Sequence, residues 1–131
     1  MEAIHTSGAP SAIAPYSQAI RHGGLLYTCG QIALDPATGT LVEGGVEAQA
    51  HQALKNLQTV VEAGGSSMDR VIKTTVYVAD MADYAAVNAI YLQYFPTAPR
   101  PARSAVAAAG LPLGTLIEID CIAACRQDYQ Y

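Results

Sequence analysis

The longest regular pattern in the sequence is an amphipathic segment from Val46 to Ala63. Apolar residues recur in it every three to four positions, which is the period of an α-helix. The apolar stripe consists of Val46, Ala50, Ala53, Leu54, Leu57, Val60 and Val61. Gly64 and Gly65 follow directly and are typical of a helix end. Because such a helix has to bury its stripe against another element, the pattern predicts a layered fold.

Short segments with strand character lie on both sides of this helix. Strands are expected within residues 1–15 and at Ser17–Arg21, Leu25–Cys29, Val71–Val78, Ala102–Ala109 and Thr115–Ala124. Their β-branched and aromatic content favours this conformation, and His22-Gly23-Gly24 is typical of a hairpin turn. A second helix is expected to begin at Asp80 and to end before Pro96. The predicted order is therefore β-β-β-α-β-α-β-β.

Two helices can cover only one face of such a mixed sheet. Charged residues, which would solvate the other face, make up 14% of the chain, against about 25% in an average globular domain. Contiguous apolar surface on a small domain is commonly buried by association. We therefore expect a single domain over residues 1–131 whose open sheet face is covered by further copies of the chain. A soluble monomer with an Ala-rich surface is the alternative.

The charge balance argues against two classes of partner. The formal net charge is −4 and the isoelectric point is about 5.1, whereas nucleic-acid surfaces need clustered Lys and Arg and anionic membranes attract basic segments. No stretch reaches the ~20 apolar residues of a transmembrane helix, and Met1–Pro10 lacks the pattern of a signal peptide. We expect no nucleic-acid partner, no membrane partner and a cytoplasmic location.

The cysteines predict neither a disulfide nor a metal site. Their number is odd, and four residues of strand hold Cys121 and Cys125 ~13 Å apart, which is too far for a disulfide bond. Reduced thiols in a reducing compartment are expected. The histidines are scattered, at positions His5, His22 and His51. We expect no bound metal.

Two charged residues stand out because their neighbours are apolar: Arg103 within Pro101–Val106, and Glu118 within Leu116–Asp120. Buried charges are usually paired, so one interpretation is a buried Arg–Glu ion pair, or an arginine at a subunit interface. The other is an anion site, because a guanidinium donates two parallel hydrogen bonds to a carboxylate and a nearby glutamate can activate water. The sequence contains no nucleophile elbow, phosphate loop or zinc-protease motif.

Seven short motifs in this chain resemble the RidA (Rid/YjgF) family. They are Ala14-Pro15-Tyr16-Ser17-Gln18, Thr28-Cys29-Gly30-Gln31-Ile32, Asp35-Pro36-Ala37-Thr38-Gly39, Lys73-Thr74-Thr75-Val76-Tyr77, Val87-Asn88 with Tyr91, Pro101-Ala102-Arg103-Ser104 and Ile117-Glu118-Ile119. Each motif alone is weak, but together they occur in the family's order and cover almost the whole chain.

The resemblance implies an α+β, chorismate-mutase-like fold with two helices on one face of a mixed sheet. It implies a homotrimer whose sheets form a central barrel, with active sites in the clefts between neighbouring subunits and without a cofactor. It implies a 2-iminobutanoate/2-iminopropanoate deaminase, which hydrolyses small reactive 2-imino acids, including the tautomer 2-aminoacrylate, to 2-keto acids and ammonia.

The family's functional residues map onto this sequence one by one. Arg103 matches the arginine that anchors the substrate carboxylate, and Glu118 matches the glutamate that positions water. The substrate-binding residues implied are Tyr16, Cys29, Gly30, Asn88, Arg103 and Ala105, of which Cys29, Gly30 and Ala105 line the pocket with their backbone. Tyr16 as a cap on the core, and Cys29 as a small core-facing residue, are the alternatives. Asp120 shares a sheet face with Glu118 and is assigned a structural or solvent role.

Four positions depart from the family's common residues. They are Cys29, where many members have Ser, Ala105 in place of Cys, Ala107 in place of Glu, and Gly110 in place of a basic residue. The changed lining leaves the preferred substrate side chain open. Two other functions also stay open: a non-catalytic sensor of small carboxylates in the same cleft, and a ribonuclease or translation inhibitor.

Overall fold

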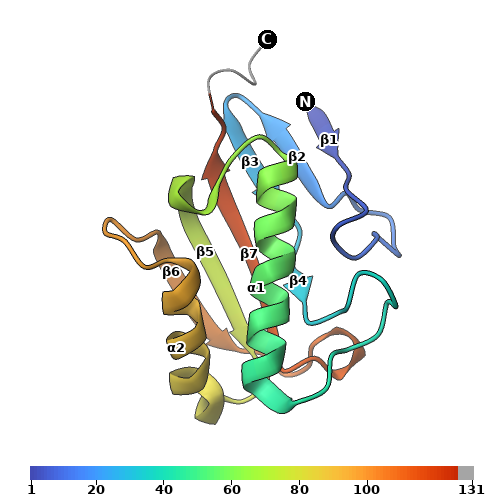
Figure 1. The fold of residues 1–131 in the computed structure, drawn as a ribbon, viewed down its shortest axis with the longest axis vertical. Coiled ribbons are helices and arrows are strands. Elements are labelled where there is room, and N and C mark those ends of the chain that lie inside the picture. Colours follow the sequence, from blue (N-terminus) through green and yellow to red (C-terminus); the bar gives the residue numbers. More distant parts are fainter. Residues whose placement is uncertain (127–131) are drawn as a thin grey trace.

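The computed structural model describes residues 1–126, so the last five residues of the predicted domain lie outside the described part. The helices are α1 (Gly45–Ala63) and α2 (Tyr84–Tyr94), and 3₁₀ turns occur at η1 (Met68–Arg70), η2 (Met81–Asp83) and η3 (Pro112–Gly114). The strands are β1 (Glu2–Ile4), β2 (Ala19–His22), β3 (Leu25–Thr28), β4 (Gln31–Ile32), β5 (Val71–Val78), β6 (Ala102–Ala107) and β7 (Ile117–Ala124) (Figure 1). The predicted order is confirmed, with β4 as an additional strand.

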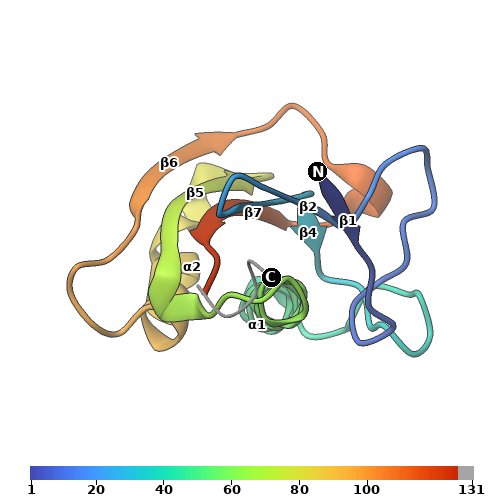
Figure 2. The same ribbon diagram turned by 90° about the horizontal axis from the view of Figure 1, so that it is seen from above.

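The strands form one mixed sheet in the order β1-β2-β3-β7-β5-β6, and β4 also pairs with β7. The β5–β6 pair is parallel, with α2 in the crossover, and the other pairs are antiparallel. Both helices lie on the same face of the sheet (Figure 2). The α+β class with two helices on one sheet face is therefore confirmed.

The core lies between α1 and the sheet, as the helical period predicts. The stripe of α1 is fully buried from Ala50 to Val61, and it packs with sheet residues such as Leu26, Ile117 and Ile119. Gly64 ends the helix directly above Leu26, and a Cβ atom at Gly64 would overlap the leucine side chain. A glycine is needed here because the chain passes too close to the sheet for any side chain.

Element boundaries differ from the predictions by a few residues. Strand β6 ends at Ala107, and β7 begins at Ile117 because Thr115 is used in a buried turn, where its hydroxyl donates to the Ile117 carbonyl at 3.0 Å. Helix α2 begins only at Tyr84, after a 3₁₀ turn that Asp80 caps by accepting from the Ala82 N–H at 2.9 Å. Two-residue strands such as β4 carry no periodic signal, so sequence patterns do not detect them.

The face of the sheet opposite the helices is open in the single chain and exposes large side chains. Tyr27, Ile72 and Val106 are each more than 40% exposed.

The three cysteines are free, as expected. Within residues 1–126, no helix is both long and apolar enough to span a membrane.

Candidate active site

A cavity of about 470 Å³ opens between the loop before β2, the β3–β4 segment and the turn η3. Its lining is mostly apolar and consists of Pro10, Ser11, Ile13, Ala14, Tyr16, Cys29, Gly30, Gln31, Ile32, Leu34, Pro112, Leu113 and Glu118. Four of the predicted site residues, Tyr16, Cys29, Gly30 and Glu118, therefore share one cavity. Among residues 1–126, this lining contains one carboxylate and no Lys, Arg or His.

Glu118 extends across the backbone of Gly30 at the wall of this cavity. A Cβ atom built on Gly30 would overlap the carboxylate Oε2, Cδ and Cγ of Glu118. Glycine at position 30 is therefore what allows the Glu118 carboxylate to lie there. The sequence places the two residues 88 positions apart, so only the pairing of β4 with β7 brings them together.

The local electrostatics raise the pKa of Glu118 above that of an ordinary glutamate. Burial and the negative charge of Asp120 both raise the pKa of Glu118. Burial also raises the pKa of Asp120, while a hydrogen bond from Tyr77 opposes that shift. Tyr77 is the register partner of Glu118 on β5, and the charge of Asp120 is the main cause that raises the Tyr77 pKa. A carboxyl with a raised pKa is a better proton acceptor near neutral pH than an ordinary glutamate.

Tyr16 and Cys29 both face the cavity rather than the core. Tyr16 is 49% exposed and lies outside the cluster of buried apolar residues. Cys29 is half-buried and also lies outside that cluster. Its thiol accepts a hydrogen bond from Gln31 Nε2 at 3.2 Å, and burial raises its pKa. The neutral thiol is therefore favoured over the nucleophilic thiolate.

Three buried side-chain amides fix the walls of the cavity. Gln18 Nε2 donates to the Pro10 carbonyl at 2.8 Å and holds the loop before β2. Asn56 Nδ2 donates to the Leu34 carbonyl at 2.8 Å. Gln49 Oε1 accepts from the Leu116 N–H at 2.8 Å and holds the segment after η3. Since the loops themselves lack regular structure, these bonds to their backbone give the cavity its shape.

Arg103 lies on a different side of the molecule, on the edge strand β6. Its register partner Thr74 is fully buried under α2, whereas Glu118 pairs with Tyr77, three residues further along β5. Positions three apart on a strand point to opposite faces. Figure 2 shows β6 at the upper left and the cavity-lining loops at the right. Of the two interpretations of these residues, the one that pairs Arg103 with Glu118 as an ion pair within one chain is therefore wrong.

The Arg103 side chain packs against aromatic residues of α2. Its Nη2 donates a hydrogen bond to the Tyr84 hydroxyl at 2.7 Å. Its Cζ lies 4.7 Å from the ring centre of Tyr91 and 5.4 Å from that of Tyr84. Among residues 1–126, no carboxylate lies within salt-bridge distance of Arg103. The guanidinium is thus held in place, while no acid within residues 1–126 neutralises its charge.

The other predicted site residues lie on the Arg103 side. Ala105 follows on β6, half-buried against the core, and Asn88 lies one turn after Tyr84 on α2. The predicted site is therefore divided: Arg103, Ala105 and Asn88 form an arginine half, and the residues around Glu118 form a cavity half.

The sequence patterns did not identify the residues that support both halves. Tyr84 and Tyr91 lie within the predicted second helix, and two hydroxyl-bearing residues seven apart share a helix face. Gln49 and Asn56 are also seven apart, on α1, and lie beside its apolar stripe. Buried amides at helical spacing are the signal that would have revealed them.

Comparison with known proteins places the chain in a family. Residues 6–125 match the family described as Endoribonuclease L-PSP. The chain belongs to this family. It is the Rid (YjgF) family that the sequence motifs resemble, and relatives carry the RidA and imine-deaminase names.

Several relatives are similar over nearly their full length. A RutC family protein of Synechocystis is 54% identical over 124 residues, which cover 94% of this chain and 95% of the relative. A mouse protein named 2-iminobutanoate/2-iminopropanoate deaminase is 49% identical over 120 residues, 92% of this chain and 88% of the relative. The crystal structure of RidA from an Antarctic Psychrobacter superimposes with a TM-score of 0.90 at 39% identity, covering 95% and 99% of the two chains.

Proposed function

We propose that this protein hydrolyses small 2-imino acids, such as 2-iminobutanoate and 2-iminopropanoate, to 2-keto acids and ammonia. The observation that carries the proposal is the division of charge between the two halves of the site. In the described part of the chain, the cavity has a carboxylate and no cation, and Arg103 has no carboxylate partner. A substrate with an anionic carboxylate next to an electrophilic carbon needs both groups. The name of the mouse relative supports the same reaction.

We further propose that the two halves meet between subunits of a homotrimer whose sheets form a central barrel. Arg103 of one copy would then face the cavity of the next. The halves lie on different sides of one chain, so a head-to-tail contact brings them together, and such contacts close into rings. The open sheet face, with Tyr27, Ile72 and Val106 exposed, offers the surface that association would bury.

In this arrangement Arg103 binds the substrate carboxylate through its planar fork and so places the imine carbon near Glu118. The backbone of Cys29, Gly30 and Ala105, with the side chains of Tyr16 and Asn88, would line the remaining substrate surface. Glu118 holds a water molecule against the imine carbon. The apolar lining of the cavity accommodates the substrate side chain.

The chemistry then consists of water attack, cleavage of the C–N bond and the proton transfers that accompany them. The water oxygen attacks the imine carbon, Glu118 takes the proton of the water, and the C=N electron pair moves to nitrogen, which receives a proton. The product is a tetrahedral carbinolamine. The amino group then takes up a further proton while the hydroxyl loses its own, so the C=O bond forms, the C–N bond breaks, ammonia leaves and a 2-keto acid remains. A raised pKa suits Glu118 to both accept and return the proton.

The test is hydrolysis of 2-iminobutanoate, generated in the assay by an amino-acid oxidase and followed as 2-ketobutanoate formation. We expect Arg103→Ala to lose turnover and binding of 2-ketobutanoate in calorimetry. Glu118→Gln keeps the shape of the side chain but loses the charge, so kcat should fall by roughly 10²-fold while keto-acid binding persists.

Two results would point to the other functions. Binding of 2-ketobutanoate without any turnover by the parent protein would support the sensor. Cleavage of RNA that survives Arg103→Ala would support a ribonuclease, as in the family description, although the acidic chain and its cavity oppose an RNA site. Light scattering that reports a monomer at micromolar concentration would contradict the shared site.

A further inference from the structure

We propose that Tyr84 is a positioning residue for Arg103. Its hydroxyl holds the Arg103 guanidinium in the orientation that binds the substrate carboxylate before the substrate arrives. Arginine is long and flexible, and on an edge strand its side chain would otherwise sample many rotamers. A guanidinium that is already oriented loses less conformational entropy when it binds a carboxylate.

Two different contacts restrain the guanidinium. The Tyr84 hydroxyl accepts a hydrogen bond from Nη2 at 2.7 Å, which fixes one edge of the planar group. The ring of Tyr91, 4.7 Å from Cζ, covers one of its faces. Within residues 1–126, Tyr84 is the hydrogen-bond partner of Arg103, so N–H groups on the rest of the fork are left for a ligand.

Both tyrosines are themselves fixed by the fold. The Tyr91 hydroxyl shares a 2.8 Å hydrogen bond with the buried Thr74, and its ring packs 4.6 Å from that of Phe95. Tyr84 begins α2 directly after the turn that Asp80 caps. Arg103 is therefore restrained by two fixed residues: Tyr91 is anchored to the sheet through Thr74, and Tyr84 is anchored at the capped start of α2.

The Tyr84 hydroxyl contributes little to the core itself. Tyr84 is half-buried and lies outside the cluster of buried apolar residues, which does contain Tyr91 and Phe95. Its hydroxyl contacts the charged group of the proposed site, not a backbone group of the core. Tyr84→Phe keeps the ring and removes only this contact, so a change in Arg103 can be separated from a loss of folding.

The inference rests on the proposed function, because it takes the ligand to be the substrate carboxylate. We expect Tyr84→Phe to weaken 2-ketobutanoate binding and raise KM about 3- to 10-fold, the effect of one additional side chain to be ordered on binding. The kcat at saturation should stay within about twofold, because Glu118 and its water are untouched. Hydrolysis by the parent alone tests the proposed function.

A second measurement needs no ligand. The ¹⁵N relaxation of the Arg103 Nε–H group reports how ordered the side chain is, and its signal can be assigned from its absence in Arg103→Lys. We expect Arg103 to be ordered in the parent and mobile in Tyr84→Phe. The matched control is Tyr94→Phe, which removes a hydroxyl from the same helix, one that contacts His51 instead.

The proposal is supported if Arg103 loses order in Tyr84→Phe and keeps it in Tyr94→Phe. It is overturned if Arg103 is equally ordered in the parent and in Tyr84→Phe, whatever the activity. It is also overturned if both variants loosen Arg103 alike, because the hydroxyl would then act only through the helix. Absence of hydrolysis by the parent protein would contradict the proposed function, and the measurement of Arg103 order would still decide the role of Tyr84.

Discussion

The two halves of the candidate site are built in different ways. The cavity half consists of loops that distant residues hold: Gln49 bonds to Leu116, 67 positions away, through its buried side chain. The arginine half consists of a strand and the helix before it, and Arg103 meets Tyr84 only 19 positions away. The cavity half therefore depends on contacts across the whole fold, whereas the arginine half depends only on the packing of α2 against the strand β6 that follows it. Neither half has both charges that the proposed substrate requires.

The largest expected effect comes from placing the two halves on different subunits. Arg103→Ala and Glu118→Gln should each lose about 10²-fold or more in activity. Co-expressed in one cell, they should recover activity, because one of the three clefts in each mixed head-to-tail trimer combines the native Arg103 of one subunit with the native Glu118 of the next. The measurement is the rate of 2-iminobutanoate hydrolysis by mixed trimers that are purified through two different tags.

The matched control is the double variant Arg103→Ala, Glu118→Gln mixed with either single variant, which leaves no complete cleft. If the mixture of single variants is as inactive as this control, the two residues do not act across a subunit interface. The proposal that the arginine half of one subunit completes the cavity half of the next would then be contradicted.

A smaller effect is expected from Gly30→Ala, which alters only the cavity half. The new Cβ atom would push the Glu118 carboxylate aside, and a misplaced catalytic group reduces kcat/KM by about 10- to 100-fold. Binding of 2-ketobutanoate to Arg103 should be affected less. Gly110→Ala is the matched control, because a Cβ atom there meets no other atom within 4 Å. Equal activity of the two variants would show that the Glu118–Gly30 contact is dispensable.

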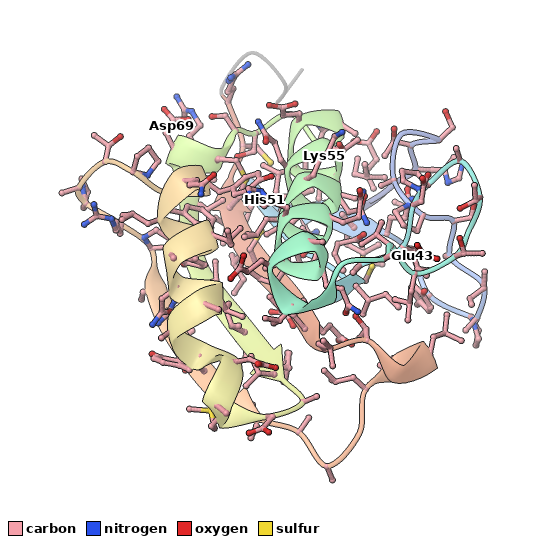
Figure 3. All side chains as sticks on the ribbon, turned by 60° about the horizontal axis from the view of Figure 1, so that its bottom comes forward. Glu43, His51, Lys55 and Asp69 are labelled. Carbon is pink, nitrogen blue, oxygen red and sulfur yellow. The ribbon has the colours of Figure 1, made fainter. Side chains whose placement is uncertain are left out.

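The smallest effect is expected from Asp120→Asn, and it appears in the pH profile. In the proposed mechanism Glu118 has to be ionised to accept a proton, so turnover should fall as the pH drops through its pKa. Burial first, and the charge of Asp120 second, raise this pKa. Removing the second cause lowers the pKa, so the acid limb of kcat/KM should move to lower pH while activity near pH 8 stays almost unchanged. The exposed Glu43, labelled in Figure 3 on the loop before α1, provides the control Glu43→Gln.

If the acid limb of the kcat/KM profile is the same in Asp120→Asn and in the parent, the charge of Asp120 does not affect the pKa of Glu118. A shift to higher pH would contradict the sign of the interaction. A comparable shift in Glu43→Gln would indicate a change in overall charge instead of a contact on one sheet face.

Much of the fold could be predicted because its patterns are local. The period of α1, the turn at Gly23 and Gly24, and the alternation of buried and exposed residues along β7 each depend on neighbours within a few residues. The same alternation places Glu118 and Asp120 together on one face, as predicted. The strand β4 was missed because two residues show no period.

What the sequence by itself determined is the set of chemical groups and the face on which each one lies along its own element. Alternation within β7 orients Glu118, and the apolar surroundings of Arg103 mark it as unusual. Only the tertiary structure decided that Arg103 and Glu118 point to opposite faces of the sheet. The reason is that their relative orientation depends on the register of β6 and β7 against β5. A shift of one residue in either pairing would reverse it, and no local pattern specifies that register.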